Sequence, residues 1–222
     1  MRPGVETRLK PWRRATWLAV MLVTACSTPM KQDKTLQKTA AKAQPSARID
    51  IQQDTTGFTI LEDVRVSADV RAEYESAVRM LEMQQYEQGI ASLLTLAESG
   101  SNVTAVHIDL GMAYARTGDL DKAEASLRQA LQLNPRHPIA YNELGMVYRR
   151  KGKFNEARAS YQKALELFPM FHFAHRNLAI LCDVYLADLA CAFQHYTAYQ
   201  QAAPDDAETV KWLADLNVRA KR

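Results

Sequence analysis

One set of apolar and small residues occurs twice in this chain, at a fixed separation of 34 residues. Because a constant period of this length marks a repeated structural unit, the chain is predicted to be a stack of similar units. Such a stack offers an extended surface to another chain and has no preformed reaction pocket, so a binding scaffold is the first functional hypothesis. The matched positions are Leu110-Gly111, Tyr114, Ala123, Leu127, Ala130 and Pro135, followed by Leu144-Gly145, Tyr148, Ala157, Tyr161, Ala164 and Pro169.

This pattern resembles the tetratricopeptide repeat (TPR), a unit of two helices with Leu-Gly, Tyr, Ala, an aromatic residue, Ala and Pro in this order. The Trp that often opens the pattern is replaced by His107 and Tyr141. Gly111 is expected where the two helices of a unit approach closely. Gly118 and Gly152 are expected to end first helices in a left-handed conformation. The resemblance implies an all-α solenoid.

Weaker copies of the pattern extend the repeats in both directions. The last copy is out of phase by one residue, which predicts an insertion near a turn at Ala187-Asp188. The final residues, 206–222, predict a helix that caps the stack, with Val210, Leu213, Ala214 and Val218 as its apolar stripe. The four predicted repeats are 70–103, 104–137, 138–171 and 172–205.

The amino terminus has the layout of a secretory signal peptide. Basic residues precede an apolar run, 15–25, that is too short for a stable membrane anchor. Residues 1–25 are therefore predicted to be removed. Arg13-Arg14 permits twin-arginine export, although a simple basic segment is the plainer interpretation.

Val23-Thr24-Ala25-Cys26 resembles the lipobox of bacterial lipoproteins. The resemblance implies that Cys26 becomes the first mature residue and carries a lipid anchor. Ser27 in the next position resembles lipoproteins that reach the outer membrane. The expected location is therefore the outer membrane, facing the periplasm.

The net charge changes when the signal peptide is left out. The chain has 28 Lys and Arg against 25 Asp and Glu, and residues 1–25 contain 5 basic residues and 1 acidic residue. The mature chain therefore has 23 against 24 (28 − 5 and 25 − 1) and is nearly neutral. This balance gives no support to nucleic-acid binding.

Residues 26–69 are predicted to be a lipid-anchored tether with an N-terminal extension. Up to about Asp54 the segment is polar and has almost no large apolar side chain, so it is expected to be flexible. An apolar patch follows, which either docks on the first repeat or adds to a partner. The patch consists of Phe58, Ile60, Leu61, Val64 and Val66.

A partner-binding groove is predicted from the resemblance, because the first helices of TPR units line the concave side. Its mixed apolar and polar lining suits an extended or helical peptide. Phe173 and Ile180 also reach these positions, but packing against the cap explains them equally well. The predicted groove residues are Tyr74, Val78, Ile108, Met112, Asn142, Met146, Arg149, Arg176 and Asn177.

Two pairs of residues raise chemical possibilities in the last repeat. Cys182 and Cys191 are equally far from the predicted turn and could form a disulfide, with two buried thiols as the alternative. His172 and His175 lie one helical turn apart, but no third ligand accompanies them, so no metal site is predicted.

No catalytic motif, cofactor motif or paired-carboxylate site is recognisable, and a catalytic function is not predicted. The main hypothesis is a lipoprotein scaffold that binds a protein partner in an envelope assembly. By resemblance, the candidate roles are pilus and secretin assembly, TonB-type energy transduction and recruitment of cell-wall enzymes. The alternative is a self-associating structural lipoprotein whose repeats form a homodimer.

Overall fold

A computed structural model describes residues 49–54, 57–62, 64, 66–100 and 102–221. The chain divides between residues 65 and 66 into two compact units. The predicted signal peptide, the lipobox cysteine Cys26 and most of the predicted tether lie outside the described residues. In the described part of the chain, none of the helices is long and apolar enough to span a bilayer.

The first unit contains a β-hairpin that the sequence analysis did not predict. Strands β1 (Ile49–Asp54) and β2 (Gly57–Glu62) pair antiparallel, with Ile51 opposite Ile60. Isoleucine and threonine favour strands, and the Ile51 and Ile60 pair provides an apolar cross-strand contact. The end of the predicted flexible tether is therefore a strand, and three residues of the predicted apolar patch lie on β2. Whether the patch docks on the first repeat stays a prediction.

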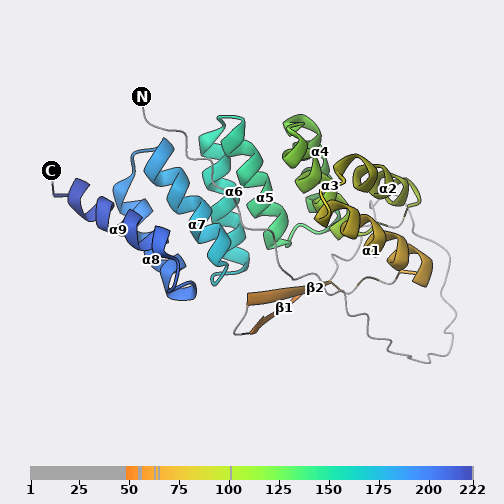
Figure 1. Cartoon of the computed structure of the whole chain (residues 1–222), viewed down its shortest axis with the longest axis horizontal. Coiled ribbons are helices and arrows are strands. Elements are labelled where there is room, and N and C mark those ends of the chain that lie inside the picture. The colour runs from red at the N-terminus through yellow and green to blue at the C-terminus, as the bar shows by residue number, and fades with distance from the viewer. Residues whose placement is uncertain (1–48, 55–56, 63, 65, 101, 222) are drawn as a thin grey trace, which may run out of the picture. The chain divides into compact units, whose positions relative to one another are not determined.

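The second unit is all helical, as predicted, and consists in its described part of nine α-helices with one π-turn (Figure 1). Each pair of antiparallel helices forms one repeat, and helices α3, α5 and α7 begin at the first residues of three predicted repeats. The elements are α1 (Ala68–Glu82), α2 (Tyr86–Glu98), α3 (Thr104–Thr117), α4 (Leu120–Leu133), α5 (Pro138–Arg150), α6 (Phe154–Leu167), α7 (His172–Ile180), the π-turn η1 (Leu181–Tyr185), α8 (Leu189–Ala202) and α9 (Ala207–Arg219).

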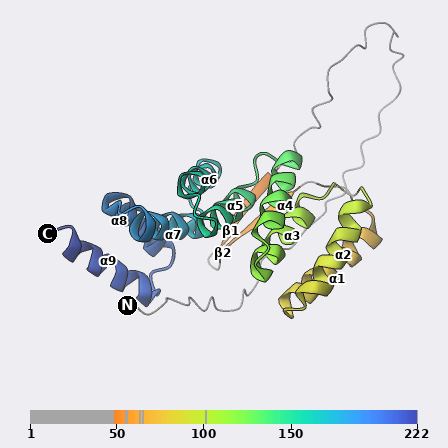
Figure 2. The ribbon, with the colours of Figure 1, turned by 90° about the horizontal axis from the view of Figure 1, so that it is seen from above.

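The helices follow one another in chain order along the stack (Figures 1 and 2). Each first helix packs on the second helix of its own repeat and on the first helix of the next repeat. The repeated small and large apolar positions are buried, as the fixed period predicted. Ala123, Leu127 and Ala130 on α4 have no solvent exposure, and the same holds for Ala157, Tyr161 and Ala164 on α6.

Gly111 explains why the Leu-Gly pair recurs. A Cβ atom built on Gly111 would lie 2.5 Å from Leu127 Cγ, and one on Gly145 would lie 2.6 Å from Tyr161 Cε1. These distances are far shorter than a normal carbon–carbon contact. The two helices of a repeat therefore approach closely at the glycine, as predicted.

The turn between the two helices of each repeat uses one left-handed residue. Gly118 and Gly152 have φ values of 94° and 73°, as predicted from their sequence positions. Gln84 and Ala187 occupy the equivalent position in the outer repeats with φ values of 62° and 53°. The conformation is thus a property of the repeat, and only the two inner repeats use glycine for it.

The one-residue insertion of the last repeat is taken up by the π-turn η1. A π-turn accommodates one extra residue because its hydrogen bonds join residues five apart, as from Leu186 N to Leu181 O. The insertion therefore lies in the first helix and not in the Ala187-Asp188 turn. Asp188 keeps its role as N-cap of α8 and accepts a hydrogen bond from Cys191 N at 3.1 Å.

The final helix α9 covers the end of the stack, but with a different face from the one predicted. Leu216 and Thr209 are buried, whereas Val210 and Val218 are exposed. The Trp212 ring lies 5.2 Å from the Tyr196 ring of α8, centroid to centroid. Leu213 also packs on the core, so the predicted apolar stripe is correct for Leu213 and wrong for Val210, Ala214 and Val218, which are exposed.

Candidate partner-binding face

The candidate site lies on the first helices of the repeats. We define the first-helix face by the fifth, sixth and ninth residues of each repeat. The fifth residues are Tyr74, Ile108, Asn142 and Arg176, the sixth are Glu75, Asp109, Glu143 and Asn177, and the ninth are Val78, Met112, Met146 and Ile180.

Two polar contacts on this face join a fifth residue to the sixth residue of the next repeat. Tyr74 Oη donates a hydrogen bond to Asp109 Oδ2 at 2.7 Å. Asn177 Nδ2 donates to Asn142 Oδ1 at 3.0 Å, in the same geometrical relation two repeats later. These bonds join neighbouring first helices and set the spacing at which a ligand would meet them.

The structure adds two acidic residues to the predicted site, Asp109 and Glu143. Burial raises the pKa of Asp109 to about 6, although the Tyr74 hydrogen bond opposes the shift. Burial also raises the pKa of Glu143 to about 7. The hydrogen bond from Asn142 and the charge of Arg116 lower this pKa, and the charge of Asp109 raises it. The 34-residue period alone places both carboxyls at the sixth position, so the sequence contains a signal that could have indicated them.

The ninth residues form an apolar row beside these carboxyls. Val78, Met112 and Met146 are half-buried, so part of each side chain is open to solvent. Met112 packs on the small cluster of Ile108, Ala130 and Ala140. Of the predicted groove residues, these three keep apolar surface available for contact with another chain.

Two predicted groove arginines instead pack against aromatic rings of the protein itself. The Arg149 guanidinium lies 5.8 Å from the Tyr185 ring centre. Arg176 lies 5.8 Å from the Tyr199 ring centre and 5.6 Å from that of Trp212. Cation–π contacts of this kind stabilise the stack and occupy the guanidinium faces. The guanidinium groups that were predicted to line one edge of the groove therefore contact aromatic rings of the same chain instead of being free for a ligand.

The remaining predicted lining residues differ in their accessibility. Ile108 and Asn142 are buried. The side-chain amide of Asn142 donates a hydrogen bond to Glu143 and accepts one from Asn177. Ile180 is half-buried against the core of the last repeats, in agreement with the packing alternative. Phe173 is exposed and stacks edge-on against Phe171. The residues available for direct contact with a ligand are thus Val78, the two methionines, the two carboxyls and Asn177.

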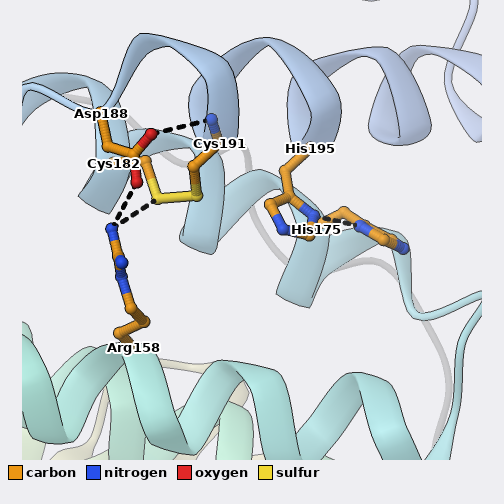
Figure 3. Close-up of a disulfide and its surroundings, with 6 residues drawn as sticks. All are labelled: Arg158, His175, Cys182, Asp188, Cys191 and His195. Carbon is orange, nitrogen blue, oxygen red and sulfur yellow. Dashed lines mark hydrogen bonds and ion pairs between the residues drawn. A yellow bond between two sulfur atoms is a disulfide. The ribbon is translucent and has the colours of Figure 1, made fainter.

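Cys182 and Cys191 form a disulfide in the structure (Figure 3). Their Cα atoms are 5.9 Å apart, within the range that a disulfide can bridge. Arg158 lies beside the bond and forms an ion pair with Asp188 at 2.8 Å. The bond connects the π-turn to α8 and holds the segment that carries the insertion.

Both ring nitrogens of His175 lie close to groups other than His172. His175 Nδ1 lies 2.9 Å from His195 Nδ1 of α8 (Figure 3). His175 Nε2 lies 2.9 Å from the Pro169 carbonyl oxygen. Burial, with smaller contributions from the charges of His175 and Arg158, lowers the pKa of His195 to about 4. Among the described residues, the group of metal-ligand size is Cys182, Asp188 and Cys191, and the disulfide occupies its sulfurs.

Stacked helix pairs whose equivalent residues meet at a constant offset define a helical-repeat scaffold. The family model described as tetratricopeptide repeat matches residues 74–138 and 108–170. The chain therefore contains tetratricopeptide repeats, and its helical unit is a TPR scaffold for protein–protein interaction. This family is typically non-enzymatic.

Solved structures share this fold. A thermophilic TPR protein of Thermus thermophilus, TTC0263, has a TM-score of 0.58 at 24% identity, covering 68% of this chain and 82% of its own. PilF of Pseudomonas aeruginosa has a TM-score of 0.63 at 18% identity, covering 68% and 69%. The first TPR of Spaghetti (RPAP3), solved with the HSP90 peptide SRMEEVD, has a TM-score of 0.51 at 19% identity, covering 54% and 96%. At these identities the likeness shows the fold alone.

A curated relative matches a shorter stretch. The anaphase-promoting complex subunit 3 of Dictyostelium discoideum is 38% identical over 66 residues, which is 30% of this chain. The matched stretch is only 7% of that relative's length. This match supports the presence of the repeat in this chain. The function of the whole relative is not assigned to this chain.

Proposed function

We propose that the chain is an outer-membrane lipoprotein that faces the periplasm and binds a protein partner on the first-helix face. The observation that carries the binding proposal is the pair of half-buried methionines, Met112 and Met146, at equivalent positions of neighbouring first helices. Methionine side chains adapt to different apolar partners, which suits a peptide-binding surface. TPR units bind peptides, and the RPAP3 repeat solved with its peptide is an example of the fold in this role.

The membrane part of the proposal comes from the amino-terminal residues. The basic segment, the short apolar run and Val23-Thr24-Ala25-Cys26 support export and lipidation. Ser27 supports the outer membrane as the destination. The proposal includes three candidate roles in the cell envelope, which are pilus and secretin assembly, TonB-type energy transduction and recruitment of cell-wall enzymes. The captured partner decides among these roles.

Lipidation is tested with a clickable palmitate analogue in growing cells and fractionation of the membranes. The wild-type chain should carry the label and sediment with the outer membrane. The Cys26→Ala variant should lose both properties. Equal labelling of the two chains would refute an anchor at Cys26.

Partner binding is tested by in-cell crosslinking of the full chain, followed by identification of the captured protein. Met112→Glu with Met146→Glu should abolish capture, because two buried charges would face an apolar partner. Met83→Glu with Met170→Glu is the matched control, because these methionines are 68% and 58% exposed and lie outside the first-helix face. Equal capture by both double variants would contradict the proposal.

A second variant separates lost binding from lost folding, because Met112 and Met146 also pack partly on the core. Met112→Ala with Met146→Ala shortens both side chains without adding charge. It should keep the helix content seen by circular dichroism and weaken capture. Full capture by this folded variant would also count against the first-helix face.

A further inference from the structure

The carboxyls of Asp109 and Glu143 each have one oxygen in use and one available. Tyr74 Oη donates to Asp109 Oδ2 at 2.7 Å, and Asn142 Nδ2 donates to Glu143 Oε1 at 3.0 Å. Within the described part of the chain, Asp109 Oδ1 and Glu143 Oε2 accept no hydrogen bond, and neither is sealed from solvent. Each residue is thus held in place and keeps an open acceptor.

The two carboxyls form no direct ion pair in the described part of the chain. No lysine, arginine or histidine of the described residues is paired with either of them. The charge of Arg116 lowers the pKa of Glu143 without forming an ion pair. Helices α3 and α5 pack against each other, and the charge of Asp109 raises the pKa of Glu143. Two like charges in a partly buried site are stabilised by a cation that reaches both.

The apolar row is a second, separate feature that favours a peptide segment as the ligand of this face. Met112 and Met146 follow Asp109 and Glu143 by three residues, so each methionine lies one helical turn from a carboxyl on the same side of its helix. A hard cation such as Mg²⁺ or Ca²⁺, which binds oxygen ligands, or a small polar ligand would gain nothing from two half-buried thioether side chains. The combination fits a segment that carries both apolar and basic side chains.

We propose, on the basis of the receptor function above, that the partner segment inserts a lysine or arginine side chain between Asp109 and Glu143 and packs apolar side chains on Met112 and Met146. The donors of the basic group meet Asp109 Oδ1 and Glu143 Oε2 as charge-assisted hydrogen bonds. An acidic segment is excluded by the sign of the charges. This chain therefore selects a different class of peptide from the Glu- and Asp-containing SRMEEVD held by the RPAP3 repeat.

The test selects dodecamers from a random displayed peptide library on the full chain carrying Cys26→Ala, which cannot be lipidated. We expect the selected peptides to contain at least about two-fold more lysine and arginine than the library, next to leucine or methionine. The strongest peptide should bind about ten-fold more weakly to Asp109→Asn with Glu143→Gln. Glu87→Gln with Glu98→Gln removes the same charge from exposed positions of α2 and should bind like the parent.

The outcomes distinguish this inference from the receptor proposal. Peptides that lose binding with Met112→Ala and Met146→Ala but bind equally to the carboxyl variant would overturn the basic-segment inference and leave the receptor proposal intact. Selection of acidic peptides, or of peptides with the library's lysine and arginine content, would also overturn the inference. If no peptide were enriched on the parent chain, both the inference and the peptide-binding face would be refuted.

Discussion

Asn177 of α7 donates a hydrogen bond to Asn142 of α5 across 3.0 Å, and this bond joins equivalent edges of two neighbouring repeats. Asn142 is buried and also donates to Glu143, so its amide connects the core of the stack to the candidate site. The same offset of one repeat plus one residue relates Tyr74 to Asp109. The first helices are therefore held in register by side chains as well as by packing.

The Asn142–Asn177 bond should show energetic coupling. Asn142→Ala and Asn177→Ala should each destabilise the chain by about 1 to 2 kcal/mol, because each leaves a buried or half-buried amide without its partner. The double variant should lose less than the sum, with a coupling energy of about 1 kcal/mol in urea denaturation. Strict additivity would show that the bond does not contribute to stability.

Gly111→Ala should destabilise the chain by about 1 to 3 kcal/mol, because the new methyl group would overlap Leu127. In an exposed helix the same change would stabilise by up to about 1 kcal/mol. The comparison is made in a Leu127→Ala background, where the space has been opened. There Gly111→Ala should be neutral or stabilising by thermal melting, and an unchanged loss would contradict close approach as the cause.

Asp109→Asn with Glu143→Gln should stabilise the chain at pH 8 and have little effect at pH 4. The folded-state pKa values of about 6 and about 7 lie above the ordinary values of 3.8 and 4.5. The folded state therefore binds more protons, and stability decreases as pH rises from about 4 through 7. After allowance for partial exposure, the gain at pH 8 should be about 2 kcal/mol.

The control for this pH dependence is Glu87→Gln with Glu98→Gln, which removes the same net charge from exposed positions. Urea denaturation at pH 4, 6 and 8 gives the free energy of unfolding for each variant. If the carboxyl variant changed stability equally at all three values, Asp109 and Glu143 would be ordinary surface carboxyls.

Removal of the disulfide should weaken the last repeat. Cys182→Ser with Cys191→Ser opens a short loop, whose closure contributes about 2 to 3 kcal/mol in the chain-entropy model. Thermal melting with and without dithiothreitol checks the effect, because the reductant should destabilise the parent chain and leave the serine variant unchanged. A reductant effect of the same size on both chains would exclude the bond as its source.

The helical stack could be predicted from the sequence because its determinants repeat. Gly111, Gly118 and Leu127 each recur, or are replaced by a similar residue, 34 positions later, so a single unit specified the architecture of the others. The hairpin at Ile49–Asp54 and Gly57–Glu62 has no such copy. Its short alternation of isoleucine with polar residues was outweighed by the polar composition of the surrounding segment.

The candidate site was less predictable because it depends on contacts between repeats. Position alone placed Arg149 and Arg176 in the groove, but aromatic rings from η1, α8 and α9 take up their guanidinium groups. His175 pairs with His195 across two helices, which helical spacing within α7 could not indicate. The 34-residue period places Asp109 and Glu143 at equivalent positions. Their burial and their hydrogen bonds, which mark them as site residues, are visible only in the structure.

The most direct test of the receptor account places a photocrosslinking amino acid at position 112 in one strain and at position 83 in another. Both chains are expressed at native level and irradiated in growing cells. The account predicts a specific protein adduct from position 112 and none from position 83. Adducts of equal yield from both positions, or an adduct from position 83 alone, would contradict partner binding on the first-helix face.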